Sequence, residues 1–189
     1  MKFSLKSKGF TLIELLVVIS IVGLLSTLGL VALGSARAKA RDVKRVADLK
    51  QVQKALEMFY NEPGLIGYPT PSPVTLGLDA TCLSSEGLKP TSCGGSIYMG
   101  LLPIDPSASA SEICDGTNDQ PCNYTYTRTG TDGFEINFYL ERGIENLTPD
   151  GNKCLKASGF INSRCPCGDG ACVSGETCST CFTDCGVCP

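Results

Sequence analysis

The stretch Gly9-Phe10-Thr11-Leu12-Ile13-Glu14-Leu15-Leu16-Val17-Val18-Ile19-Ser20 decides the fold of the first third of this chain. Its single charge is Glu14, and the next charged residue along the chain is Arg37. The apolar run from Phe10 to Leu33 exceeds the roughly 20 residues that a helix needs to cross a bilayer. A carboxylate inside such a helix costs about 2.5–3.5 kcal/mol on insertion scales. We therefore expect a membrane-spanning helix in which Glu14 later meets a partner that offsets this cost.

A short leader, residues 1–9, precedes the apolar run and carries three lysines and no acid. The leader ends in Gly9, and the sequence Phe10-Thr11-Leu12-Ile13-Glu14 that follows resembles the processing site of type IV prepilins and of the pseudopilins of type II secretion. The resemblance implies cleavage after Gly9 by a prepilin peptidase, methylation of the new N-terminus at Phe10, and Glu14 as the assembly carboxylate. It also implies a homopolymer with identical or related pilins, built at an inner-membrane assembly platform.

A cleaved secretory signal and an ordinary signal anchor also contain an apolar run. A secretory signal has an apolar region of only about 7–15 residues, with its cut site after that region. A signal anchor is favoured by the lysines of the leader, but the basic residues from Arg37 to Arg45 oppose that orientation. All twelve cysteines lie beyond residue 81, and disulfides form outside the cytoplasm. We therefore expect a single-pass membrane protein whose C-terminal domain lies outside the cytoplasm, and then a periplasmic or extracellular filament.

The composition argues against an enzyme. The chain has 189 residues, a net charge of −3 and no histidine, which removes the imidazole that many nucleophilic and zinc sites use. It contains no P-loop, dinucleotide-binding glycine motif or nucleophile elbow. The small net charge gives no indication of nucleic-acid binding. We expect no cofactor, with calcium as the one alternative.

Helical periodicity continues beyond the apolar run. Apolar residues recur every three or four positions from Val43 to Tyr60, and Asn61-Glu62-Pro63-Gly64 is typical of a helix end. We expect one helix over Thr11–Tyr60 and an α+β fold, in which this helix packs on a small antiparallel sheet and a disulfide-rich tail follows. The expected segments are the leader 1–9, which is removed, the transmembrane and assembly helix 10–33, its amphipathic half 34–62, a pilin-like globular domain 63–153 and a cysteine-rich tail 154–189.

Strand patterns lie between the helix and the tail. The clearest is Phe134–Leu140, where apolar and polar residues alternate strictly. Ser96–Leu102 and the region of Tyr124 and Tyr126 are weaker candidates, and 129–133 fits a hairpin turn. Three or four antiparallel strands with one apolar face would cover the amphipathic half of the helix. The order of these motifs also resembles the globular domain of the major pseudopilins, which can bind calcium, but no ligand position carries over to this chain.

The cysteines fall into two groups. Cys82 and Cys93 flank one loop, and Cys114 and Cys122 flank another, so each pair can close locally. The other eight disulfide candidates belong to the tail: Cys154, Cys165, Cys167, Cys172, Cys178, Cys181, Cys185 and Cys188. Zinc is the alternative for the last four, but their two pairs are closer than in a zinc ribbon, so disulfides are favoured. Asp169, Glu176 and Asp184 leave calcium open in the tail.

Three functional hypotheses are compatible with the sequence. The first is a structural subunit of a type IV pilus or of a type II secretion pseudopilus. The second is a minor or tip pilin that acts as an adhesin through its cysteine-rich tail. The third is a membrane-tethered module that never polymerises. Two triplets, Asn123-Tyr124-Thr125 and Asn146-Leu147-Thr148, also match the N-glycosylation pattern, which is a weak signal because it often occurs by chance.

Overall fold

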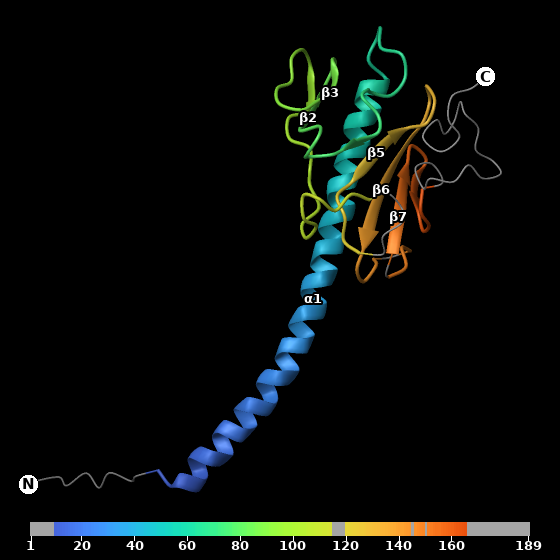
Figure 1. Cartoon of the computed structure of the whole chain (residues 1–189). Helices are drawn as coiled ribbons and strands as arrows, with labels where there is room; N and C mark the ends of the chain where they lie inside the picture. The colour runs from blue at the N-terminus through green and yellow to red at the C-terminus, as the bar shows by residue number, and fades with distance from the viewer. Residues whose placement is uncertain (1–9, 115–119, 145, 150, 166–189) are drawn as a thin grey trace, which may run out of the picture. The chain divides into compact units, whose positions relative to one another are not determined.

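One long helix is the main element of the chain. The computed structural model describes residues 10–114, 120–144, 146–149 and 151–165, and the chain divides into two compact units, 1–37 and 38–189. Helix α1 (Leu12–Tyr60) belongs to both units (Figure 1). The helix ends where Asn61 donates its backbone N–H and its side-chain amide to the carbonyl of Glu57, two residues before Pro63. The helix expected over Thr11–Tyr60 is confirmed to within one residue.

In the first unit, the described side chains of α1 and of the two residues before it are exposed up to Arg37. They include large apolar side chains such as Leu12, Ile13 and Leu24, each well over half exposed. Within the described residues, α1 is the one helix long and apolar enough to cross a membrane. A helix that is apolar on every side has no single apolar face that could pack on a domain of the same chain. It therefore needs lipid or other helices around it.

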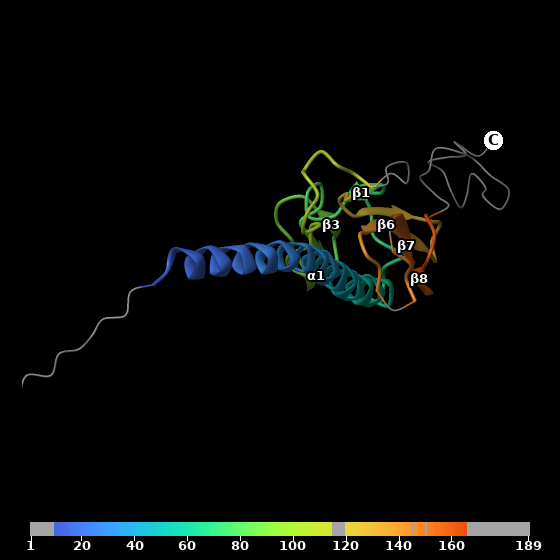
Figure 2. The same cartoon turned by 90° about the horizontal axis from the view of Figure 1, so that it is seen from below.

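The second unit contains two antiparallel sheets. The larger has the strand order β1-β5-β6-β7-β8 and the smaller the order β3-β2-β4. In Figure 1, β2 and β3 of the smaller sheet lie to the left of the C-terminal part of α1, and β5, β6 and β7 of the larger sheet lie to its right. Figure 2 shows β6, β7 and β8 of the larger sheet side by side. The strands are β1 (Val74–Thr75), β2 (Cys82–Ser84), β3 (Gly87–Lys89), β4 (Ile97–Met99), β5 (Thr125–Arg128), β6 (Phe134–Leu140), β7 (Gly151–Lys156) and β8 (Gly159–Ile161).

The sheet content is larger than the three or four strands expected from the sequence. The bounds of β6 agree with the predicted strand, and the β5–β6 hairpin closes with Thr129 donating its N–H to the carbonyl of Gly133. The strands that the sequence did not reveal, β1, β2, β3, β7 and β8, are mostly two or three residues long. An alternating pattern cannot be recognised over two or three residues, so only tertiary pairing defines β1, β2, β3 and β8. Strand β7 has six residues, but its sequence Gly-Asn-Lys-Cys-Leu-Lys does not alternate between apolar and polar residues.

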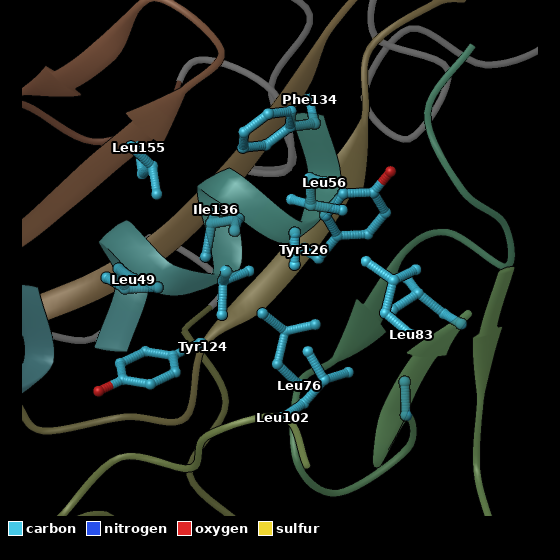
Figure 3. Close-up of a cluster of buried hydrophobic side chains, with 14 of the residues drawn as sticks. Leu49, Leu56, Leu76, Leu83, Leu102, Tyr124, Tyr126, Phe134, Ile136 and Leu155 are labelled. Carbon is cyan, nitrogen blue, oxygen red and sulfur yellow. The ribbon is translucent and has the colours of Figure 1, made fainter. Parts of the chain in front are cut away.

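The hydrophobic core lies between α1 and the sheets. Leu49, Val52 and Leu56 of the helix are buried against β5, β6 and β7 (Figure 3). The same cluster also takes side chains from the smaller sheet and its loops, among them Leu83 and Leu102. The amphipathic half of the helix thus packs as its periodicity predicts, with one stripe toward its own domain.

The second face of β6 is also buried, which the sequence did not predict. Glu135, Asn137 and Tyr139 alternate with the core residues of β6, a pattern typical of a solvent-exposed face, yet each is at least nine-tenths buried. Tyr139 packs against Cys114 and Cys122, and the carbonyl of the Asn137 side chain accepts the backbone N–H of Cys165. Disulfide-bonded segments therefore cover this face in place of water.

Three disulfides are formed within the described residues: Cys82–Cys93, Cys114–Cys122 and Cys154–Cys165. The first two confirm the local pairings expected from the sequence. Cys154, expected at the start of the tail, lies inside β7 and pairs with Ile161 of β8, so the sheet extends past that boundary. The other six candidate cysteines, Cys167, Cys172, Cys178, Cys181, Cys185 and Cys188, lie outside the described residues, as do Asp169, Glu176 and Asp184.

Candidate assembly site

Glu14 lies in the first turn of α1, where it forms a reciprocal cap with Thr11. The Glu14 carboxylate accepts the backbone N–H of Thr11 at 2.9 Å and its hydroxyl at 2.7 Å. The hydroxyl oxygen of Thr11 in turn accepts the backbone N–H of Glu14 at 3.3 Å. This is a capping box, in which a Thr-x-x-Glu sequence satisfies helix N–H groups that have no partner inside the helix. The three-residue spacing of Thr11 and Glu14 in the sequence predicts this capping box, whereas the hydropathy and charge of the segment do not predict it.

Phe10 and Glu14 lie on the same side of the helix start. Together with Ile13, Val17 and Val18 they line one shallow hollow on the surface of the first unit. Phe10 is 85% exposed. Gly9, the residue expected before the cleavage point, lies outside the described residues. The hollow is therefore an apolar surface with a single carboxylate in it.

Among the residues that the structure describes, no cationic group compensates the charge of Glu14. Within the described residues no salt bridge involves Glu14, and its hydrogen-bond donors are the neutral groups of Thr11. A capping box stabilises a helix start by about 1 kcal/mol, which is less than the cost of a carboxylate in lipid. The geometry can therefore accept a cationic group from outside the chain.

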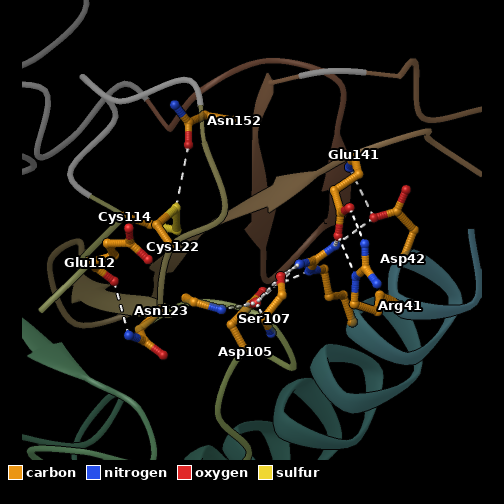
Figure 4. Close-up of polar contacts among 12 residues, drawn as sticks. Arg41, Asp42, Asp105, Ser107, Glu112, Cys114, Cys122, Asn123, Glu141 and Asn152 are labelled. Carbon is orange, nitrogen blue, oxygen red and sulfur yellow. Dashed lines mark hydrogen bonds and ion pairs between the residues drawn. A yellow bond between two sulfur atoms is a disulfide. The ribbon is translucent and has the colours of Figure 1, made fainter. Parts of the chain in front are cut away.

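A second polar site, which the sequence did not predict, is a charge cluster in the second unit formed by Arg41, Asp42, Arg45, Asp105 and Glu141 (Figure 4). Arg45 is fully buried, and its guanidinium bonds Asp105 at 2.6 Å, Asp42 at 2.7 Å and Glu141 at 2.8 Å. Arg41 forms a two-bond pair with Glu141. The two cations and three carboxylates of the cluster carry a net charge of −1.

The charge cluster fixes α1 to two loops. Asp42 accepts the backbone N–H groups of Glu141, Arg142 and Gly143, which form the turn after β6. Asp105 accepts the N–H groups of Ser107 and Ala108. Buried carboxylates need several donors of this kind to offset the loss of water.

Glu141 titrates abnormally because of its two arginine partners. Hydrogen bonds from Arg41, and then from Arg45, lower the pKa of the Glu141 carboxyl to about 2, against the raising effect of partial burial. The carboxyl is therefore ionised at any pH at which the domain is expected to function.

The sequence carried a partial signal for the charge cluster. Arg45 is four residues before Leu49, so it lies on the buried stripe of α1, and Asp42 is three residues before Arg45. In the sequence, Arg41 and Arg45 belong to the run of basic residues from Arg37 to Arg45, and this run does not indicate that Arg45 is buried. Their acidic partners Asp105 and Glu141 are about 60 and 100 residues away in the chain, and only the fold brings them together.

The described residues offer no metal centre. Their one group of potential ligands is Glu135 with Cys154 and Cys165. The two sulfurs are bonded to each other, and the Glu135 carboxylate pairs with Lys156 at 2.7 Å. A disulfide sulfur is not the thiolate that binds a metal. This group therefore does not indicate a cofactor.

The N-terminal part of the chain, which contains the start of α1, matches a known protein family. Residues 4–30 match the protein family described as the prokaryotic N-terminal methylation motif. This match covers residues 4–9 of the leader, Phe10, Glu14 and most of the apolar run. No solved structure matches the chain significantly.

Curated relatives extend the similarity beyond the motif. The type II secretion system core protein G of Vibrio cholerae is 32% identical over 106 residues, which is 56% of this chain and 69% of that protein. The corresponding protein of Escherichia coli strain K12 is 39% identical over 103 residues, 53% of this chain and 67% of that protein. The type IV wide pilus major component PilA4 of Thermus thermophilus is 32% identical over 108 residues, 51% of this chain and 82% of that protein.

Proposed function

This chain belongs to the family of type II secretion pseudopilins and type IV pilins, and from this premise we propose that it is a filament subunit that polymerises through α1. Members of this family are structural subunits and not enzymes. We infer that a prepilin peptidase removes residues 1–9, that the new N-terminus at Phe10 is methylated, and that Glu14 binds this N-terminus in assembly.

One observation supports the proposal. The described side chains of residues 10–37 are exposed and mostly apolar, and the single charged residue before Arg37 in this range is Glu14. Such a surface is stable in lipid before assembly and among identical helices afterwards. Cleavage after Gly9 would create a positive amine at Phe10, which lines the same hollow as Glu14. Each charge alone is costly in an apolar surrounding, so the amine and Glu14 should pair. The four-residue spacing also allows a pair within one helix, and the resemblance to pilins is what favours a pair between the amine of one subunit and Glu14 of its neighbour.

The same proposal implies where α1 and the second unit lie relative to the membrane. Before assembly, α1 anchors the subunit in the membrane and the second unit lies outside the cytoplasm, where its disulfides are stable. The proposed partners are identical or related pilins, the prepilin peptidase and an inner-membrane assembly platform. The described start of the expected tail, 154–165, contributes to β7 and β8 of the second unit, and Cys154, Leu155 and Cys165 in it are buried.

Mass spectrometry of the mature N-terminus tests the first step. We expect a chain that begins at Phe10 and carries one methyl group on its amine. A Gly9→Leu variant should remain uncut in the membrane, because a large side chain replaces the smallest one at the cleavage point. An uncut wild-type chain, or one cut after Leu33, would contradict the proposed function.

A further inference from the structure

The two N-glycosylation triplets of the chain differ completely in their surroundings. In the first, Asn123 is only 2% exposed, and its side-chain amide donates to the carbonyl of Ser109 at 2.6 Å. The same amide donates to the carbonyl of Glu112 at 2.9 Å (Figure 4). Both amide hydrogens are used in these bonds. Its neighbours Cys122 and Tyr124 are buried as well. A transferase cannot reach this amide in the folded domain.

The second triplet lies at the tip of a tight turn. Ile144 and Leu147 exchange both backbone hydrogen bonds, with N–O distances of 3.1 and 2.8 Å, so that Asn146 lies within a four-residue turn. Asn146 is exposed. Thr148, the third residue of the triplet, is also exposed, and it donates its backbone N–H and its hydroxyl to the Asn162 side chain. The turn therefore presents Asn146 and Thr148 together on the surface.

A hollow beside Asn146 has room for a bound sugar. It has a volume of about 220 Å³ and is lined by Asn146 itself and by Val46, Lys50, Leu147, Phe160 and Asn162. Sugar rings pack their C–H faces on apolar and aromatic side chains, and their hydroxyls bond amide and ammonium groups, both of which are present here. The hollow is thus chemically suited to the first residue of a glycan.

We propose that Asn146 is an N-glycosylation site and that Asn123 is not. The reaction joins the Asn146 amide nitrogen to the anomeric carbon of a sugar carried on a polyprenyl diphosphate. The bond between that carbon and the diphosphate oxygen breaks, the diphosphate leaves with the electron pair, and the amide nitrogen loses one proton to a base of the transferase. The inference rests on the proposed function in one respect, since the domain must leave the cytoplasm to meet such a donor.

Peptide mass spectrometry of the full-length protein, purified from membranes and filaments of its own source organism, tests this site. Trypsin cuts after Arg142 and Lys153, so one peptide contains Asn146. We expect this peptide to carry the added mass of a glycan. Asn146→Gln and Thr148→Ala should abolish the added mass, whereas Thr148→Ser should keep it, because serine also serves as the third residue. Thr125→Val, a matched change in the buried triplet, should leave it unaltered.

An unmodified Asn146 peptide in the wild-type protein would overturn the proposal, and so would a glycan on the peptide that contains Asn123. The same digest reports the N-terminal peptide, which separates this inference from the proposed function. Methylated Phe10 together with an unmodified Asn146 would contradict the glycosylation site alone. An uncut leader would contradict the filament assignment, while the Asn146 peptide would still decide the modification.

Discussion

Glu14 takes part in helix capping and, in the proposed filament, in charge pairing. Single substitutions can distinguish the effects of these two interactions. In the subunit it caps α1 through Thr11, and in the proposed filament it pairs with an N-terminal amine. Glu14→Gln keeps a capping box, since glutamine serves in that position, but removes the charge. Thr11→Val removes the capping hydroxyl and keeps the carboxylate.

We expect both variants to be cleaved and inserted in the membrane. Recovery of sheared filaments should fall about tenfold or more for Glu14→Gln, because the amine then stays unpaired at a cost of about 2.5 kcal/mol or more. For Thr11→Val it should stay near the wild-type amount, with a loss of about 1 kcal/mol in helix capping. If the threonine variant lost filaments as severely as the glutamine variant, capping and not charge pairing would be the role of Glu14.

Glu141 gives the domain a defined response to acid. Its pKa in the folded state, about 2, is lower than the ordinary value of 4.5, so its contribution to stability is fully present above about pH 4.5. This contribution is lost as the pH falls from about 4.5 toward 2, since the unfolded chain binds the proton first.

Urea unfolding of the wild-type protein and of Glu141→Gln measures this effect. The wild type should be the more stable protein at pH 7, and the difference between the two should shrink between about pH 4.5 and 2. The variant supplies the control for every other carboxylate in the domain. A difference that stays constant down to pH 2 would show that the ion pairs of Glu141 do not stabilise the fold.

At the scale of elements, the charge cluster holds α1 against the loops that follow β4 and β6. Arg45→Met would leave Asp42 and Asp105 buried without their cation, so we expect a loss of about 3–5 kcal/mol in the free energy of unfolding. Arg41→Met is the matched control, because the Arg41 side chain is 35% exposed and its pair with Glu141 is partly solvated. Its loss should be about 1 kcal/mol or less. Equal losses in the two variants, measured by urea unfolding, would exclude a special role for Arg45.

The larger sheet shows how disulfides take the place of a second helix layer. One face of β6 packs on α1, and the other carries Tyr139 against the Cys114–Cys122 disulfide. A strand buried on both faces needs cover on both, and here short cross-linked segments supply it. The Cys114–Cys122 disulfide therefore contributes to the buried packing of the sheet, in addition to cross-linking the chain.

At the scale of the whole molecule, the division into two units predicts that they can be separated. The buried core residues all belong to the second unit, from Ala38 onward, and the exposed apolar run belongs to the first. A chain that begins at Ala38, produced under oxidising conditions, should therefore be folded and monomeric without detergent. Its thermal unfolding should occur within a few degrees of that of the full chain in detergent. Aggregation of this fragment, or non-cooperative unfolding measured by circular dichroism, would show that residues 10–37 also support the domain.

The sequence by itself determined the features that depend on near neighbours. The helix over Thr11–Tyr60 and strand β6 follow from periodicity, because their causes lie within a few turns of chain. The short spacing of Cys82 from Cys93 and of Cys114 from Cys122 indicated that each pair can close locally, and the structure contains both disulfides. Glu14 could also be singled out, since one carboxylate in a long apolar run is conspicuous without any structure.

Only the tertiary structure decided the features that join distant segments. It placed Arg45 at the centre of a buried charge cluster, since Asp105 and Glu141 reach it only through the fold. It placed Cys154 inside β7 and buried the polar face of β6 under disulfides. It also showed that Asn123 is buried and Asn146 is exposed, although both residues begin a triplet that matches the N-glycosylation pattern. Burial depends on what the rest of the chain places over a residue, and no local pattern contains that information.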